Sequence, residues 1–115
     1  MLLIWYPKCT TCQKAKKWLD DKSVEIETRH IKDENPSYNE LKEWHEKSGL
    51  PLKRFFNTSG LLYKSLQLKD KLPTMSEDEQ LKLLASDGML VKRPILITKK
   101  GITTGFKEKE WEKLI

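Results

Sequence analysis

LLIWYPKCTTC, residues 2–12, contains the signals for a first strand and for the helix that follows it. Its first five residues form a continuous apolar and aromatic run of strand length, which predicts a buried central strand. Pro7 ends this strand because it has no backbone N–H to donate. From Thr10 as far as Leu19, apolar residues recur three and four positions apart, which predicts a helix. The two cysteines of the stretch therefore lie where a strand turns into a helix.

The position of Cys9 favours redox chemistry. Thr10 and Gln13 have the spacing of a capping box, which would begin the helix directly after Cys9. A helix N-terminus offers free N–H groups and a positive dipole end, and both stabilise a thiolate. Cys12 follows one turn later, so it can attack a mixed disulfide on Cys9. We predict Cys9 as the nucleophile and Cys12 as the resolving thiol.

Two other interpretations of the cysteine pair stay open. Free cysteines are often small buried hydrophobic residues, although Cys9 falls at a turn and not inside an element. A structural zinc site needs four ligands, and only His30 and His45 remain, far apart in the sequence. We expect no metal, and we interpret both histidines as surface residues without a role.

The remaining elements predict an α/β domain. Residues 24–29 alternate apolar and polar, which predicts a half-buried strand, parallel to the first through a right-handed crossover. Residues 95–97 and 102–106 predict a β-hairpin that turns at Gly101. Residues 108–115 have the spacing of a short final helix. The order is β-α-β, a set of helices, then β-β-α, in a mixed sheet.

A helical insert is predicted at about residues 36–88. Two of its helices each have a capping box before them and a glycine after them: Ser37, Glu40 and Gly49, then Ser76, Glu79 and Gly88. Residues 52–72 predict short helices around a polar loop. With 115 residues in all, the chain fits one domain, residues 1–115.

Composition limits the partners. The formal net charge is +5, and all but three of the 22 cationic residues are lysines interleaved with acidic residues. Nucleic-acid readers concentrate arginine on one face, so we expect no direct nucleic-acid partner. No apolar run reaches membrane-spanning length, and residues 1–6 lack the basic leader of a signal peptide. Two cysteines so close together cannot staple a secreted scaffold, so we expect a cytoplasmic protein that does not bind membranes.

The motif Tyr6-Pro7-Lys8-Cys9-Thr10-Thr11-Cys12, followed about eighty residues later by Arg93-Pro94-Ile95 and the Gly101 turn, resembles the arsenate reductase ArsC/Spx family. The likeness covers essentially the whole chain. It implies a thioredoxin-like fold with an inserted helical subdomain. It also favours a cis Pro94 that faces the active site, with Arg93 beside Cys9. An arginine there can stabilise a thiolate or hold an oxyanion.

The resemblance also implies a substrate pocket. Arsenate reductases of this family use one essential cysteine, matching Cys9, and three arginines, of which only Arg93 matches cleanly. Asn57 stands where the first would be and Lys107 near the third, which argues against efficient arsenate reduction. The residues implied for the pocket wall are Lys8, Thr11, Asn57, Ser59, Pro94 and Lys107.

Two functions follow from this resemblance. The first is a thiol-disulfide redox enzyme that acts on a small oxyanion or a disulfide. It would hold no bound cofactor and use glutathione with glutaredoxin, or thioredoxin, as reductant. The second is a Spx-like regulator, since Spx-type proteins carry a CxxC redox switch and bind the C-terminal domain of the RNA polymerase alpha subunit. Cys9 and Cys12 fit that switch as well.

Overall fold

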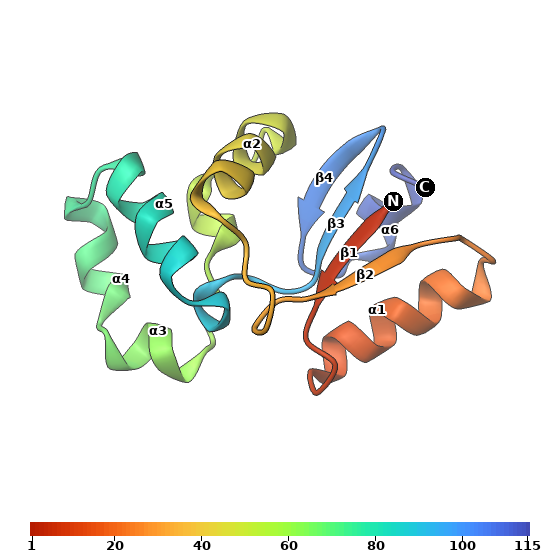
Figure 1. Ribbon diagram of the computed structural model, residues 1–115, viewed down its shortest axis with the longest axis horizontal. Coiled ribbons are helices and arrows are strands. Elements are labelled where there is room, and N and C mark those ends of the chain that lie inside the picture. Colours follow the sequence, from red (N-terminus) through yellow and green to blue (C-terminus); the bar gives the residue numbers. More distant parts are fainter.

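The computed structural model describes all 115 residues and contains one four-stranded mixed sheet (Figure 1). Its strands are β1 (Leu2–Trp5), β2 (Glu27–His30), β3 (Ile95–Thr98) and β4 (Gly101–Thr104), in the order β2-β1-β3-β4. β1 runs parallel to β2 and antiparallel to β3, and β3 pairs antiparallel with β4. The predicted α/β class, parallel crossover and hairpin are confirmed. Gly101, predicted in the hairpin turn, is instead the first residue of β4, and Lys99 and Lys100 make the turn. β4 ends at Thr104 and not at residue 106.

The β2 strand begins later than the alternating pattern predicted. Its register pairs Leu2 with Glu27, and the Glu27 N–H donates to the Met1 carbonyl at 3.1 Å. Residues 24–26 have no strand beside them, because β1 starts only at Leu2. Alternation of side chains shows which face is buried, but the length of the neighbouring strand decides where pairing starts.

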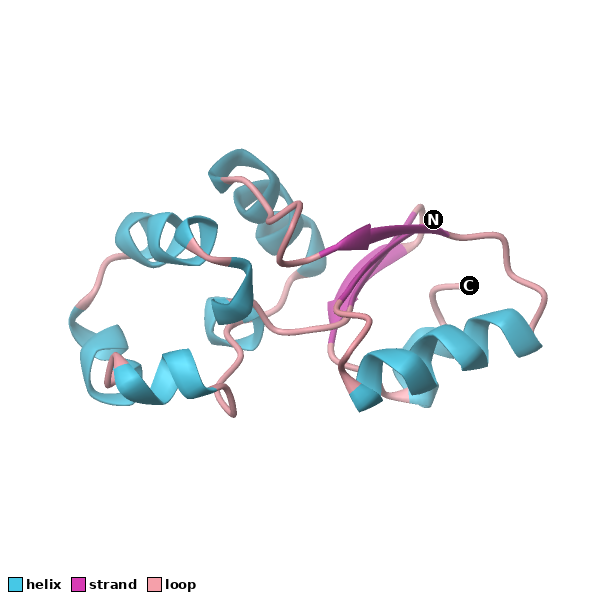
Figure 2. Cartoon of the chain, turned by 60° about the horizontal axis from the view of Figure 1, so that its bottom comes forward, coloured by secondary structure: helices cyan, strands magenta, loops and turns pink.

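Helices cover the two faces of the sheet unequally. α1 (Thr10–Asp21) and α6 (Glu108–Glu112) pack on one face, where Leu3 and Leu96 meet Trp111. Ile4, Ile95 and Ile102 point to the other face and join the core of the helical part. Figure 2 shows α1 beneath the sheet, whereas most of the helices between β2 and β3 lie beyond one end of it. None of the helices combines the length and apolar character needed to cross a bilayer.

The start of α1 differs in detail from the prediction. Cys9 is the N-cap, and the helix begins directly after it as expected, but its side chain makes no capping bond. The predicted capping box of Thr10 and Gln13 is wrong, because Thr10 is already the first helical residue. The Gln13 side-chain amide instead donates to the Pro7 carbonyl at 2.8 Å, which ties the helix to the preceding turn.

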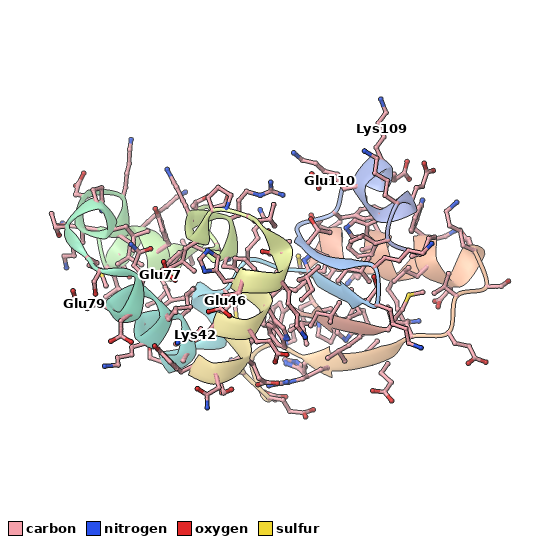
Figure 3. All side chains as sticks on the ribbon, turned by 90° about the horizontal axis from the view of Figure 1, so that it is seen from above. Lys42, Glu46, Glu77, Glu79, Lys109 and Glu110 are labelled. Carbon is pink, nitrogen blue, oxygen red and sulfur yellow. The ribbon has the colours of Figure 1, made fainter.

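The chain between β2 and β3 is helical. It forms α2 (Tyr38–Ser48), α3 (Leu61–Ser65), α4 (Leu68–Lys71) and α5 (Glu77–Ser86), with 3₁₀ turns η1 (Leu52–Phe55), η2 (Leu72–Thr74) and η3 (Gly88–Leu90). Both predicted capping boxes of α2 and α5 are present. Gly49 ends α2 in the left-handed region, at φ 67°, as predicted. In Figure 3, Lys42 and Glu46 of α2 lie near Glu77 of the neighbouring α5, whereas Glu79 lies farther out.

Gly88 does not cap α5, contrary to the prediction. The C-cap is Asp87, in an extended conformation, and Gly88 begins η3. A Cβ at Gly88 would lie 1.9 Å from the Ile31 carbonyl oxygen. Close packing of η3 on the end of β2 therefore requires this glycine.

The two histidines are not simple surface residues. The His45 side chain is only 16% exposed and packs edge-on against Phe55 at 5.9 Å between ring centres. The His30 ring meets Tyr6 edge-on at 5.5 Å. Neighbouring charges in the sequence suggested exposure, but tertiary packing covers most of both rings.

Candidate functional site

Cys9 and Cys12 are both free thiols in different surroundings. Cys12 is fully buried, and the Tyr6 N–H donates to its sulfur at 3.5 Å. Cys9 is half-buried at the N-cap of α1, and its own N–H donates to the Tyr6 carbonyl at 2.9 Å. The turn between β1 and α1 thus presents Cys9 and shields Cys12.

These surroundings shift the two thiol pKa values in opposite directions. Burial raises the pKa of Cys9, but hydrogen bonds from the Cys12 backbone N–H, the Arg93 guanidinium and the Cys12 thiol outweigh burial, so the net pKa is lowered. Burial raises the pKa of Cys12 to about 12, with a further contribution from negative charge on Cys9. At neutral pH, Cys9 is the thiolate-forming partner and Cys12 keeps its proton.

Arg93 reaches the cysteines from the segment just before β3. The Arg93-Pro94 peptide bond is cis, as the resemblance favoured. The Arg93 guanidinium lies over the Tyr6 ring, 4.9 Å from its centre, and its Nη1 lies 3.9 Å from the Met89 sulfur. Pro94 is buried, and its carbonyl accepts the Gly105 N–H at 2.8 Å, which joins it to the end of β4.

A cavity of about 790 Å³ opens beside Cys9, between the sheet and the helical part. Six of the predicted site residues line it: Cys9, Thr11, Asn57, Ser59, Arg93 and Lys107. Lys8 is exposed outside the cavity, while Pro94 and Cys12 are buried behind its wall. The structure therefore brings together most of the predicted site, from four separate parts of the chain.

The cavity wall is strongly cationic. No Asp or Glu lines it, whereas five basic side chains do: Lys53, Arg54, Lys92, Arg93 and Lys107. A cavity lined by one sign of charge concentrates ligands of the opposite sign. The site is therefore suited to an anionic molecule that presents its reacting atom to Cys9.

Arg54 is the main residue that sequence reasoning missed. It lies on η1, its Nη2 donates to the Thr104 carbonyl at 3.3 Å, and it lies 3.7 Å from a carboxylate oxygen of Glu110. Thr104 in turn donates its hydroxyl to the Arg54 carbonyl at 2.7 Å. Figure 3 shows Glu110 on α6. The available signal was that Arg54, one of only three arginines, lies three residues before Asn57.

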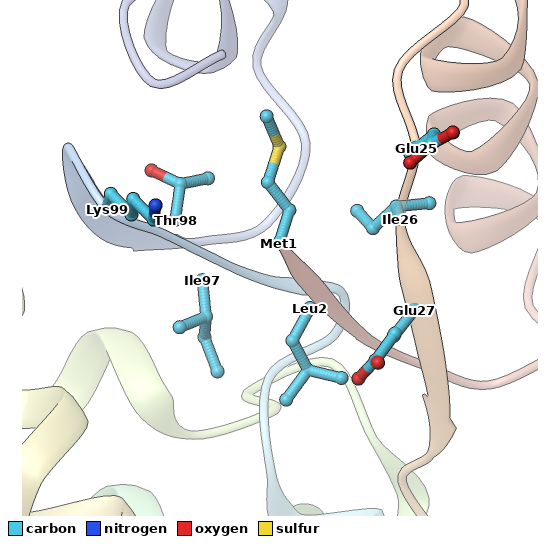
Figure 4. Close-up of a pocket in the computed structure, with 8 residues that line it drawn as sticks. All are labelled: Met1, Leu2, Glu25, Ile26, Glu27, Ile97, Thr98 and Lys99. Carbon is cyan, nitrogen blue, oxygen red and sulfur yellow. The ribbon is translucent and has the colours of Figure 1, made fainter.

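A second cavity, of about 680 Å³, lies at the opposite end of β1 from Cys9 (Figure 4). It is lined by Met1, Leu2, Glu25, Ile26, Glu27, Ile97, Thr98 and Lys99. This lining contains no cysteine or histidine, so the nucleophilic chemistry belongs to the first cavity. Nowhere in the chain do three or more His, Cys, Asp or Glu side chains gather to hold a metal ion.

Sequence relatives include regulatory proteins. The uncharacterized protein YusI of Bacillus subtilis is 60% identical over 108 residues, covering 94% of this chain and 92% of YusI. The regulatory protein MgsR of the same organism is 33% identical, covering 95% and 85%. The global transcriptional regulator Spx of Listeria innocua is 30% identical, covering 90% and 78%.

Solved structures of similar proteins superpose closely. An ArsC family related protein from Bacteroides fragilis matches with a TM-score of 0.96 and 56% identity, over 99% of this chain and 96% of that one. A possible arsenate reductase from Streptococcus mutans matches with a TM-score of 0.87 and 45% identity, over 96% of both chains. These matches confirm the predicted thioredoxin-like fold.

The resemblance inferred from the cysteine motif and the Arg-Pro segment is thereby confirmed along the chain. The model of the ArsC family matches residues 4–114, which include Cys9, Cys12 and Arg93. This protein belongs to the ArsC family, a relative both of the arsenate reductases and of the Spx and MgsR regulators.

Proposed function

We propose that this protein is a thiol-disulfide oxidoreductase in which Cys9 attacks the substrate and Cys12 resolves the intermediate. The observation that supports this most strongly is that Cys9 and Cys12 differ in burial and in pKa. Cys9, with its lowered pKa, lines a cationic cavity, whereas the buried Cys12 retains its proton next to it. A reactive thiolate beside a protected thiol is the arrangement that a two-step exchange needs.

In the first step the Cys9 thiolate attacks one sulfur of a substrate disulfide. A bond forms between the Cys9 sulfur and that sulfur, the substrate S–S bond breaks, and the other substrate sulfur leaves as a thiolate that takes up a proton. Arg93 stabilises the Cys9 thiolate before the attack by hydrogen bonding and by its charge. The cationic wall orients the anionic parts of the substrate.

In the second step Cys12 attacks the Cys9 sulfur. Burial and the negative charge of Cys9 hold the Cys12 pKa high in the reduced protein. Once Cys9 is bonded to substrate, it carries no charge, so the pKa of Cys12 falls and its proton passes to the departing substrate sulfur. The products are a Cys9–Cys12 disulfide and a substrate thiol, with two electrons transferred to the substrate. Glutathione with glutaredoxin, or thioredoxin, then reduces the disulfide.

We propose a disulfide of an anionic thiol, such as a glutathione mixed disulfide, as a better substrate than arsenate. Asn57 has no charge and Lys107 lacks the bidentate geometry of arginine, so a tetrahedral oxyanion would be held less firmly. The Cys9–Cys12 disulfide must be reduced again after each turnover, which a reducing compartment favours. On that ground we propose that the protein is cytoplasmic.

The test is turnover of a glutathione mixed disulfide and, separately, of arsenate, with glutathione plus glutaredoxin or with thioredoxin plus its reductase. Wild type, Cys9→Ser, Cys12→Ser and Arg93→Ala are compared. We expect disulfide turnover to vanish in Cys9→Ser and to fall about tenfold or more in Arg93→Ala. Equal turnover by Cys9→Ser and wild type would refute the proposal.

The relatives MgsR and Spx support a second function. Here the Cys9–Cys12 disulfide would alter affinity for a protein partner, the C-terminal domain of the RNA polymerase alpha subunit, without turnover. Binding of that domain is measured with reduced protein, oxidised protein and Cys12→Ser. Redox-dependent binding that Cys12→Ser makes constant, together with absent turnover, would establish the regulator and exclude the enzyme.

A further inference from the structure

Arg93 differs from the other two arginines in its partners. Arg29 forms a bidentate pair with Glu40, and Arg54 lies 3.7 Å from Glu110. No carboxylate lies within 4.0 Å of Arg93, which is the arginine beside Cys9. The Arg93 guanidinium instead lies 4.9 Å from the centre of the Tyr6 ring, and its Nη1 lies 3.9 Å from the Met89 sulfur.

A guanidinium that stabilises the Cys9 thiolate is best held by an uncharged side chain. A carboxylate would hold Arg93 firmly but would also cancel its charge and compete with the Cys9 thiolate for its N–H groups. An aromatic face attracts a guanidinium through the ring quadrupole and leaves its net charge intact. The Tyr6 ring can therefore fix the guanidinium while its donors stay available to sulfur.

Tyr6 is itself held from several directions. The His30 ring meets it edge-on at 5.5 Å, with the ring planes at 89°. The His30 ring is anchored in turn, because its Nδ1 accepts the backbone N–H groups of Lys32 and Asp33, each at 3.2 Å. The Tyr6 backbone joins the cysteine turn, with its carbonyl bound to the Cys9 N–H and its N–H directed at the Cys12 sulfur.

We propose that Tyr6 is a positioning residue, whose ring face holds the Arg93 guanidinium beside the Cys9 sulfur. The inference rests on the proposed function in that it takes Cys9 as the nucleophile. Tyr6 acts through Arg93 and does not touch the substrate, since it does not line the cavity. The contact uses the ring face, so phenylalanine should replace tyrosine and an aliphatic side chain should not.

The test measures the Cys9 pKa directly, from thiolate absorbance in the ultraviolet as a function of pH. All variants carry Cys12→Ser, which leaves Cys9 as the single thiol. We expect Tyr6→Leu to raise the Cys9 pKa by about one unit, roughly a tenfold loss of thiolate below the pKa. Tyr6→Phe should stay close to the Cys12→Ser parent. Tyr6→Met serves in place of Tyr6→Leu if circular dichroism shows that the latter does not fold.

A double-mutant cycle with Arg93→Ala separates positioning from a general structural effect. If Tyr6 acts through Arg93, Tyr6→Leu causes no further pKa shift once Arg93 is gone. An unchanged pKa in Tyr6→Leu, or an equal shift with and without Arg93, would overturn the proposal. The titration does not depend on turnover. If Tyr6→Leu raises the Cys9 pKa but the protein turns over no substrate, only the enzyme function is refuted. If turnover requires Cys9 but Tyr6→Leu leaves the Cys9 pKa unchanged, only the role of Tyr6 is refuted.

Discussion

Cys12 lies one helical turn after Cys9, yet only Cys9 lines the cationic cavity, while Cys12 is fully buried. The first prediction is therefore unequal alkylation. With iodoacetamide at neutral pH, we expect Cys9 to react at least about tenfold faster than Cys12, because the thiolate is the nucleophile. The Cys9 rate should reach half its maximum below pH 9.0, the ordinary thiol pKa. Peptide mass spectrometry measures both sites, with Cys9→Ser as control, and equal labelling would contradict the prediction.

A second prediction concerns Arg54. Removing one cation from the cavity wall should weaken the binding of anionic ligands. Arg54→Ala should therefore raise the KM for a glutathione mixed disulfide roughly fivefold, which corresponds to about 1 kcal/mol of binding free energy. Added salt should shrink the difference between the variant and wild type. Lys109→Ala is the matched control, because Lys109 is exposed on α6 and does not line the cavity. An equal effect of both substitutions would point to net charge and not to the cavity.

Much of the fold follows from local signals. The run that forms β1, the capping boxes of α2 and α5, and the hairpin of β3 and β4 each depend on a few neighbouring residues, so the sequence alone predicted them. The errors concern relations between distant segments. Gly88 looked like a helix cap because the sequence does not reveal the Ile31 carbonyl that packs against it.

The same distinction explains the candidate site. Cys9 and Cys12 were identified from a spacing whose chemistry is local. Arg54 was missed because contacts between distant segments bring η1 to the cavity, among them the bond of Arg54 with Thr104, fifty residues later. The apolar run predicts Tyr6 as part of a buried strand, but Tyr6 follows β1, and its contact with Arg93 joins the segment after β1 to the segment before β3. Contacts of this kind have no sequence pattern.

A third prediction tests the packing of η3 on the end of β2. Gly88→Ala should lower the free energy of unfolding by about 3 kcal/mol, because its Cβ would lie 1.9 Å from the Ile31 carbonyl oxygen and the backbone would have to move. Gly49→Ala is the comparison, with nothing within 4 Å of its Cβ and a cost of about 1 kcal/mol from its left-handed conformation alone. Urea unfolding measures both, and a smaller effect at Gly88 than at Gly49 would contradict this packing.

A fourth prediction concerns stability in acid. The hydrogen bond from Arg29 holds the pKa of Glu40 at about 2, below its ordinary 4.5. The native carboxyl binds its proton less tightly than the unfolded one, so the pair's stabilisation is complete above pH 4.5 and is lost as the pH falls through about 2. Glu40→Gln keeps a side chain able to form the capping box with Ser37, yet removes this charge.

Unfolding midpoints in urea across that pH range check the prediction. We expect a shallower loss of stability in Glu40→Gln than in wild type. Glu43→Gln, which removes an exposed carboxylate paired with Lys47, is the matched control. If wild type and Glu40→Gln lose stability in parallel, the Arg29–Glu40 pair does not contribute as described.

A single trapping experiment tests whether Cys9 attacks and Cys12 resolves. Reduced wild type, Cys9→Ser and Cys12→Ser are each mixed with oxidised glutathione, quenched with acid and weighed intact by mass spectrometry. We expect Cys12→Ser to accumulate one glutathione on Cys9, wild type to proceed to the internal disulfide, and Cys9→Ser to stay unmodified. The contrary result would be that Cys9→Ser gains glutathione on Cys12 as fast as Cys12→Ser gains it on Cys9. That result would contradict the roles of the two cysteines.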